Sequence, residues 1–411
     1  MSRVAVARFF AGLYVDKAAR VYAAKARGDL PARLALRPGQ IDPYPLYEQI
    51  RARGTFVTNR FGNLVTADHA VCDEILRSRE FGVARASSRP DVARGDSGMS
   101  MLGLNPPDHT RLRRLAAPAF GPRQIAGFRE LVADRAAALA DELARAGESD
   151  FVESFATPLP IAIISTLLGV PEEMRGDFKR HGEVIGSGLS GVRGVRHAQA
   201  LIGARRGIDD IFKDLIDLRR QEPGDDVVSR LLSTDLTRIE MLAMCRLLLV
   251  AGFETTVNAL GNAMLAFAAH PEQWERLVAD PSLAASATEE VLRYDSPVQR
   301  TDRFAQVDTE VVGVAIEAGQ NVTTLLGAAN RDPGVFADPA AFDIARDNAG
   351  AHLSFSSGIH YCLGQPLARM ETAVALETLA TRLPGLRVTD RPTYRRGVVL
   401  RGPLRLPVSA R

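Results

Sequence analysis

The sequence has few of the features that mark several common classes of protein. Its three cysteines, Cys72, Cys245 and Cys362, are odd in number and far apart, which argues against a disulfide framework and favours a reducing, cytoplasmic setting. The net charge of +2 over 411 residues gives no indication of a nucleic-acid partner. No uninterrupted apolar run approaches the roughly 20 residues that span a bilayer, so no transmembrane anchor is expected.

The length fits two or three ordinary domains or one large fold wrapped around a cofactor. We expect residues 1–41 to form an N-terminal extension and residues 42–411 to form the main domain. The extension places Phe9, Phe10 and Tyr14 among basic residues, so it is either a helix lying on the domain or a weak membrane contact. The extension lacks the continuous apolar core of a signal peptide. Of the two alternatives, we expect an amphipathic helix that lies on the domain.

The most informative stretch is 352–371, which places Cys362 between a glycine-rich loop and a helical pattern. Gly358 and Gly364 allow sharp turns of the backbone, and from Leu363 the apolar residues recur at helical spacing. The free N–H groups at the start of this helix would favour a thiolate. Such a thiolate serves as a nucleophile, a redox thiol or a metal ligand, although a lone cysteine is often simply buried.

The longest helical pattern runs from Leu236 to His270 and stops at Pro271, for a length of about 50 Å at 1.5 Å per residue. Its middle, 247–253, is apolar on every face, as expected of a buried central helix. Residues 251–256 add a glycine, an acid and two threonines to this apolar stretch. Threonine hydroxyls can bond back to carbonyls and bend a helix, so the segment is either a polar contact with another helix or a functional feature.

The remaining patterns predict a mainly α fold with small β-sheets. A hairpin is expected over 55–66, helices from Asp108 and over 284–294, a small sheet within 307–326, and short strands in the tail 386–408. Residues 181–207 contain many glycines, which weaken helices, so this segment is expected to be a loop.

Together these motifs resemble the cytochrome P-450 superfamily. The cysteine loop of that family reads Phe-Gly-x-Gly-x-His-x-Cys-x-Gly, and the chain matches it at Phe355, Gly358, His360, Cys362 and Gly364, with Ser356 in place of the first glycine. Residues 251–255 are similar to the family's oxygen-activating Ala/Gly-Gly-x-Glu/Asp-Thr pattern. Residues 290–293 are similar to its Glu-x-x-Arg pair, and 107–113 to its His-x-x-x-Arg helix.

The resemblance implies one cytochrome P-450-type domain that holds haem b between the long central helix and the cysteine loop and helix. Cys362 would be the iron ligand, and its thiolate would favour O–O cleavage. Glu254 and Thr255 would relay protons. The other cofactor-binding residues would be His109, Arg113, Ala251, Gly252, Arg303, Phe355, Gly358, His360 and Gly364. Glu290, Arg293 and Arg346 would form a buried charged cluster that supports the cysteine loop.

The implied activity is that of a mono-oxygenase that uses O2 to hydroxylate or epoxidise a small or medium apolar substrate, such as a polyketide or macrolide, a fatty acid or a terpenoid-like molecule. Electrons would come from a separate ferredoxin, docked on the Cys362 side, and its reductase. A monomer is expected, and residues 181–207 would form a lid. The expected apolar pocket is lined by Met99, Met101, Val250, Ala251, Val298 and Val399.

Three other functions are weighed against this one. A haem protein that only binds or senses a ligand would not need Glu254 and Thr255. Peroxide-driven relatives replace that acid–threonine pair, which this chain retains. A cysteine enzyme without haem would need a base near Cys362 and would leave Phe355 unexplained.

Overall fold

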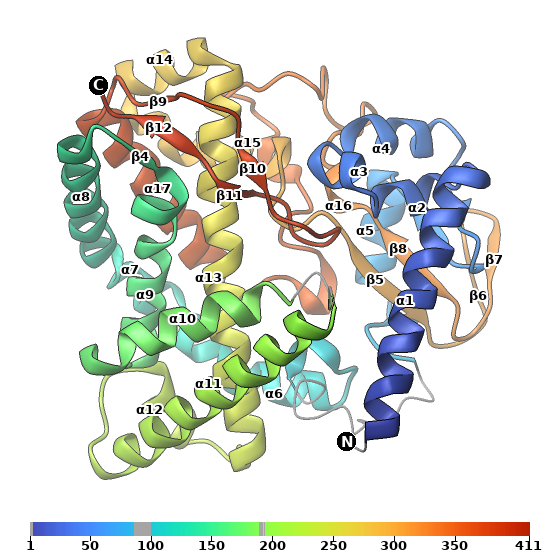
Figure 1. Ribbon diagram of the computed structural model, residues 1–411, viewed down its shortest axis with the longest axis horizontal. Coiled ribbons are helices and arrows are strands. Elements are labelled where there is room, and N and C mark those ends of the chain that lie inside the picture. Colours follow the sequence, from blue (N-terminus) through green and yellow to red (C-terminus); the bar gives the residue numbers. More distant parts are fainter. Residues whose placement is uncertain (1–2, 86–99, 189–191, 193) are drawn as a thin grey trace.

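The computed structural model describes residues 3–85, 100–188, 192 and 194–411, so Met99 of the expected pocket lies outside the described residues. Helix α13 (Arg238–Ala269) runs through the middle of the molecule (Figure 1). The N-terminal helices and the largest sheet lie on one side of it, and helices from the middle of the chain lie on the other. The mainly helical fold with small sheets is confirmed. In the part of the chain that is described, no helix is long and apolar enough to cross a membrane.

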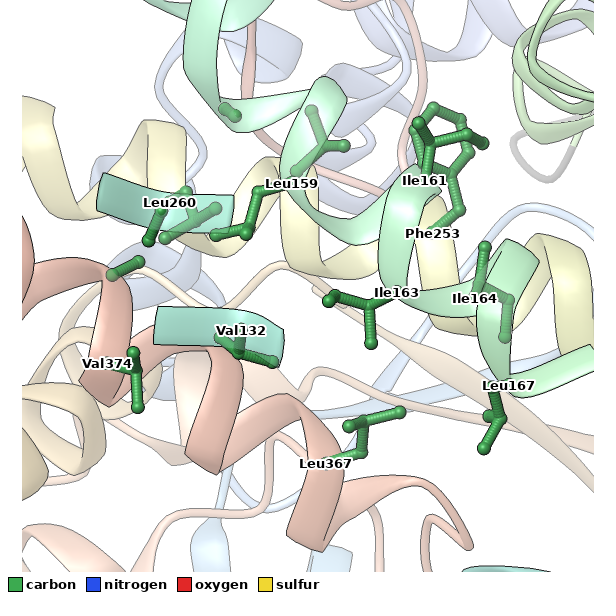
Figure 2. Close-up of a cluster of buried hydrophobic side chains, with 14 of the residues drawn as sticks. Val132, Leu159, Ile161, Ile163, Ile164, Leu167, Phe253, Leu260, Leu367 and Val374 are labelled. Atoms are coloured by element: carbon green, nitrogen blue, oxygen red, sulfur yellow. The ribbon is translucent and has the colours of Figure 1, made fainter. Parts of the chain in front are cut away.

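Helix α13 confirms the longest helical pattern in the sequence. It begins with a capping box, in which the Thr237 side chain accepts from the backbone N–H of Glu240 while the Glu240 side chain accepts from that of Thr237. It ends just before Pro271, which cannot continue a helix at this point. Its apolar side chains share one core cluster with those of α8 (Arg129–Ala146), α9 (Pro158–Leu168) and α17 (Gln365–Arg382). In Figure 2, Phe253 lies beside Ile161 and Leu260 lies beside Leu159.

The helices expected from Asp108 and over 284–294 are present as α6 (Asp108–Ala116) and α15 (Ala284–Tyr294). The helices besides α13 are α1 (Arg3–Ala26), α2 (Leu30–Leu34), α3 (Arg37–Ile41), α4 (Tyr44–Arg51), α5 (His69–Arg77), α6 (Asp108–Ala116), α7 (Pro122–Ala126), α8 (Arg129–Ala146), α9 (Pro158–Leu168), α10 (Arg175–Gly186), α11 (Val195–Gln221), α12 (Val227–Leu232), α14 (Pro271–Ala279), α15 (Ala284–Tyr294), α16 (Leu326–Ala329) and α17 (Gln365–Arg382).

The strands form four small sheets. The largest has the order β1-β2-β8-β5-β3, in which only β2 and β8 are parallel, and it contains the predicted hairpin as β1 and β2. The others are β6-β7, β10-β11 and β4-β12-β9. The strands are β1 (Val57–Thr58), β2 (Leu64–Thr66), β3 (Phe81–Gly82), β4 (Glu148–Asp150), β5 (Thr301–Ala305), β6 (Thr309–Val311), β7 (Val314–Ile316), β8 (Asn321–Thr324), β9 (Arg387–Val388), β10 (Thr393–Tyr394), β11 (Pro403–Arg405) and β12 (Pro407–Ser409).

The prediction of a loop over 181–207 is wrong for most of that segment. Helix α10 continues to Gly186 and α11 begins at Val195. The glycines allow close helix packing here. An added Cβ at Gly207 would collide with the His181 ring, and one at Gly182 would lie 3.4 Å from Leu249 on α13. Tertiary packing therefore offsets the weak helix propensity of glycine.

The N-terminal helices reach the domain through their later residues. In α1, Ala23 and Ala24 are buried, whereas Tyr14 and Val15 are exposed. Leu30 and Leu34 of α2 share a core cluster with Leu46, Tyr47 and Ile50 of α4. The domain boundary at residue 41 stays a prediction.

Candidate active site

The cysteine loop is closed by its own backbone. The N–H of Cys362 donates to the carbonyl of Phe355 at 2.9 Å, and α17 begins three residues later, as the sequence predicted. Gly358 has a φ of +65°, and a side chain there would collide with the Leu76 carbonyl of α5. Ser356, which stands where the family pattern has glycine, has a φ of +63°. The turn therefore keeps a left-handed geometry despite the serine.

The Cys362 thiol lies between opposing influences on its acidity. Burial raises the pKa of the thiol, while the backbone N–H groups of Gly364 and Gln365 and the guanidinium groups of Arg113 and Arg369 lower it. The helix start that the sequence predicted is present, but burial outweighs it for the protein alone. A bound cation would reverse this balance, because a coordinating thiol loses its proton.

A basic cluster lies beside the cysteine loop. The rings of His109 and His360 are 4.1 Å apart, and the Arg303 side chain is buried. Burial, followed by the charges of His109, Arg303 and Arg113, lowers the pKa of His360 to about 3. Both ring nitrogens of His109 and Nε2 of His360 are buried without a hydrogen-bond partner among the described residues.

No described carboxylate forms an ion pair with Arg113 or Arg303. Arg113 donates to the Tyr361 carbonyl at 2.7 Å, and Arg303 donates to the Thr301 hydroxyl at 2.9 Å. Buried cations and ring nitrogens without partners are costly, and an anion placed among them would satisfy them. This cluster therefore fits a group that carries carboxylates.

The middle of α13 exposes one strip of an otherwise buried helix. Ala251 is exposed, and Gly252 and Thr255 are half-buried, although the sequence predicted burial on every face. The Thr255 hydroxyl donates to the Ala251 carbonyl at 2.7 Å, and a Cβ on Gly252 would lie 3.1 Å from Ile164. Four residues beyond Thr255, Ala259 packs in one cluster with Phe355, Leu292 and Cys362. The exposed strip therefore lies on the helix that contacts the cysteine loop.

Glu254 does not share the exposure of its neighbour Thr255. It is 1% exposed, and its Oε1 lies 2.6 Å from Nη1 of Arg395. Burial raises the pKa of Glu254, the charge of Arg395 opposes this rise, and Glu183 adds to it. Arg395 could not be predicted as the partner of Glu254, because the two residues come from distant parts of the chain.

The structure brings Glu290, Arg293 and Arg346 together. Arg293 donates to both Glu290 oxygens, at 2.7 Å and 2.8 Å, and the two side chains have no exposed surface. Nε of Arg346 lies 3.3 Å from the same carboxylate. Arg293 also donates to the carbonyls of Asn330, Pro339 and Ala341, so the cluster fastens the segment ahead of the cysteine loop.

A second charged cluster was missed by sequence reasoning. Glu289 lies 2.6 Å from Nε of Arg369 and 3.3 Å from Nε2 of His352. The Arg369 guanidinium lies 4.5 Å from the centre of the Phe355 ring. Although burial opposes ionisation, the hydrogen bonds from His352 and Arg369 lower the pKa of Glu289 to about 2. The acid beside Glu290 was visible in the sequence, but its partners were not.

The expected pocket residues fall on separate elements. Met101 and Val250 are buried in the main core, and Val298 packs beside Leu326 and Leu353. The Val399 carbonyl accepts from the Gln299 N–H at 2.8 Å. That these side chains line one pocket with Ala251 stays a prediction.

Comparisons with known proteins give a consistent result. The family model described as cytochrome P-450 matches residues 194–383. Cytochrome P-450 140 of Mycobacterium tuberculosis is 40% identical over 407 residues, covering 93% of this chain and 92% of that protein. The 6-deoxyerythronolide B hydroxylase of Saccharopolyspora erythraea is 40% identical over 329 residues, covering 78% of this chain and 80% of that protein.

Solved structures agree with the sequence relatives. P450BioI, in a crystal structure with an acyl carrier protein ligated to hexadec-9Z-enoic acid, superposes with a TM-score of 0.84. It is 36% identical, and the match covers 90% of this chain and 98% of that one.

Proposed function

This chain belongs to the cytochrome P-450 family and is a mono-oxygenase, and we propose that it hydroxylates or epoxidises an apolar polyketide-like or fatty-acyl substrate. The observation that carries the proposal is the strip formed by Ala251, Gly252 and Thr255, exposed on the helix that packs against the Cys362 loop. Two relatives support this substrate class: the 6-deoxyerythronolide B hydroxylase, and P450BioI in its complex with an acyl carrier protein ligated to hexadec-9Z-enoic acid.

The cofactor of this family is haem, and the residues present fit haem b. We propose that Cys362 binds the iron and that Phe355 and Gly358 shape the loop around it. His109, Arg113, Arg303 and His360 would hold the two propionates. His109 and Arg303 are buried, Arg113 and His360 are half-buried, and none of the four has a carboxylate partner among the described residues. When bound through a thiolate, haem supplies the activation of O2.

The protein's own part in the reaction is to exclude water and to move protons. We propose that Thr255 receives protons at its hydroxyl and passes them into the cavity that the exposed strip borders. Glu254, one position earlier, would bring protons from solvent. The small side chains of Ala251 and Gly252 would leave room for the cofactor, and apolar neighbours such as Val250 would orient the substrate.

We propose that a ferredoxin supplies electrons from the Cys362 side. Three arginines belong to α6 and the start of α17. Arg369 is paired with Glu289 and Arg113 donates to the Tyr361 carbonyl, whereas Arg114 is exposed. An acidic partner protein would be attracted by the positive charge of Arg114.

The test combines binding with isotope incorporation. A panel of acyl chains, macrolide precursors and terpenoids is titrated against the ferric protein, and binding is measured from the shift of the absorption spectrum. The compound that binds most tightly is then incubated with the protein, a surrogate ferredoxin and its reductase under ¹⁸O₂. One ¹⁸O atom in the product is expected. Binding of the ligand with no oxygenated product would contradict a mono-oxygenase and favour the sensor function.

A further inference from the structure

A hollow of about 420 Å³ lies where the end of α11, helix α12 and the start of α13 meet (Figure 1). Met241 of α13 belongs to its wall, ten residues before Ala251 of the exposed strip. At 1.5 Å per residue, these two positions are about 15 Å apart along the helix. The hollow is therefore a separate feature from the candidate active site.

The inner wall of the hollow is apolar. Ile216 of α11, Leu231 of α12 and Met241 of α13 are buried, and Leu232 and Leu236 beside them are half-buried. An alkyl chain placed against this wall would be removed from water, which is the main favourable contribution to the binding of apolar groups. The volume also falls within the roughly 300–1,000 Å³ of ordinary small-molecule sites.

The mouth of the hollow is basic. Three arginines line it, Arg219, Arg220 and Arg238, and none of the described acidic residues does. Arg219 is held by the protein itself, since its Nε lies 2.5 Å from Asp226 and its Nη2 donates to the Gly169 carbonyl at 2.9 Å. Arg220 and Arg238 are exposed and can reach a ligand in the mouth.

Arg220 and Arg238 share one carboxylate. Nη1 of Arg220 lies 3.3 Å from Asp217, and Nη2 of Arg238 lies 3.1 Å from it. A guanidinium carries five N–H donors, and neither group has a second acceptor in the described part of the chain. Glu222 and Asp235 are exposed on the adjoining segments but do not line the hollow. Two cations with one carboxylate between them leave positive charge and unused donors at the mouth.

We propose that this hollow binds a single-chain amphipathic carboxylate of the fatty-acid class, with its alkyl chain on the apolar wall and its carboxylate between Arg220 and Arg238. A carboxylate matches the paired donors of a guanidinium. Inorganic phosphate would leave the apolar wall in contact with water, and a neutral hydrocarbon would bring no acceptor to the arginines. The bound ligand would join the end of α11 to the start of α13. The proposal concerns a second ligand, so it goes beyond the proposed function.

The test measures the binding of ¹⁴C-labelled dodecanoate to the haem-loaded protein by equilibrium dialysis, after a phenylimidazole has been bound to the iron to fill the active-site cavity. One dodecanoate per protein is expected, with no change in the spectrum of the imidazole complex. Dodecanol, which has the chain without the charge, should bind more weakly. Inorganic phosphate should not displace dodecanoate.

Variants of the mouth separate the charge from the apolar wall. Arg220→Gln and Arg238→Gln should each weaken dodecanoate binding by about two- to fivefold, as is usual for exposed charge pairs, and leave dodecanol binding unchanged. In the double variant, dodecanoate should bind no better than dodecanol. Asp217→Asn removes the competing carboxylate and should strengthen dodecanoate binding. Leu232→Trp should fill the hollow and weaken the binding of both compounds.

Arg230→Gln is the matched control, since Arg230 lies on α12 and pairs with Asp225 without lining the hollow. It should bind dodecanoate as the wild type does. The proposal is overturned by the absence of bound dodecanoate when the iron carries phenylimidazole, by an equal loss of binding in Arg230→Gln, or by full displacement with phosphate. Because the assay involves no turnover, its result does not depend on whether the protein oxygenates the proposed substrates.

Discussion

The carboxylate of Glu290 lies 2.7 Å from Nε of Arg293, and neither side chain has exposed surface. Removing one partner would leave a buried charge without its counter-ion, at a cost of about 3–5 kcal/mol. We expect Glu290→Ala to fold poorly and to lose haem, as measured by soluble yield and by haem absorbance per protein. Glu275→Ala, at an exposed position of α14, should be unchanged. A stable, fully loaded Glu290→Ala protein would contradict a supporting role for the pair.

Cys362→Ala should abolish the thiolate-type absorption of the reduced carbon monoxide complex and most of the bound haem, because the iron would lose its protein ligand. Cys72 and Cys245 are buried elsewhere and provide matched controls. Their alanine variants should keep the spectrum. If Cys362→Ala keeps it too, the assignment of the ligand is wrong.

Thr255→Ala should keep haem and substrate binding and still consume reductant, while product per electron pair falls and hydrogen peroxide rises. General acid–base groups typically contribute 10²–10⁴-fold, so the loss should be large. Thr256 is the control, since its buried hydroxyl donates to the Gly252 carbonyl at 3.2 Å. Thr256→Val should remain coupled. Full coupling in Thr255→Ala would assign the proton transfer to another group.

Glu289 should contribute to stability in a defined range of pH. Its pKa is about 2 in the folded protein against an ordinary value of 4.5, so the unfolded chain binds more protons between these limits. The contribution is therefore fully present above about pH 4.5 and is lost as the pH falls toward 2. Urea midpoints of wild type and Glu289→Gln should converge as the pH falls through this range. Parallel curves would show that the His352 and Arg369 contacts do not set the acidity of Glu289.

Arg114→Glu should raise the KM for a reducing ferredoxin, and Arg114→Gln should raise it less, because the charge on an exposed side chain acts on the approach of the partner. The difference should shrink with salt, since the screening length is about 10 Å at 0.1 M. Reduction by dithionite, which needs no docking, should be equal in all three proteins. Equal KM values for the wild type and both variants at low salt would show that the ferredoxin does not dock at α6.

Local patterns in the sequence predicted most of the fold. The helical pattern from Leu236 that stops at Pro271 predicts α13, and the apolar spacing after Leu363 predicts α17. The segment 181–207 was misread because local propensity counts glycine as a helix breaker. Close packing of Gly207 against His181 depends on a neighbouring helix that no local window includes.

The residues of the candidate site show the same difference between local motifs and contacts that depend on the tertiary fold. Residues within one motif, such as Glu290 and Arg293, could be assigned from the resemblance to the family's Glu-x-x-Arg pair. The contact of Glu254 with Arg395 joins the central helix to the tail, and the clustering of Glu289, His352 and Arg369 joins α15 to the cysteine loop and α17. Such pairs depend on the tertiary fold and leave no spacing in the sequence. Ser356 could be recognised as a departure from the motif, but its positive φ required the structure.

Strand β12 has its two neighbours far apart in the chain, since it pairs with β4 over 148–150 and with β9 over 387–388. During synthesis the N-terminal partner leaves the ribosome long before residues 407–409 exist. Strand β4 must therefore keep this edge unpaired until residues 407–409 are made. The appearance of β12, and not helix formation, then sets the earliest moment at which the sheet of β4, β12 and β9 can form.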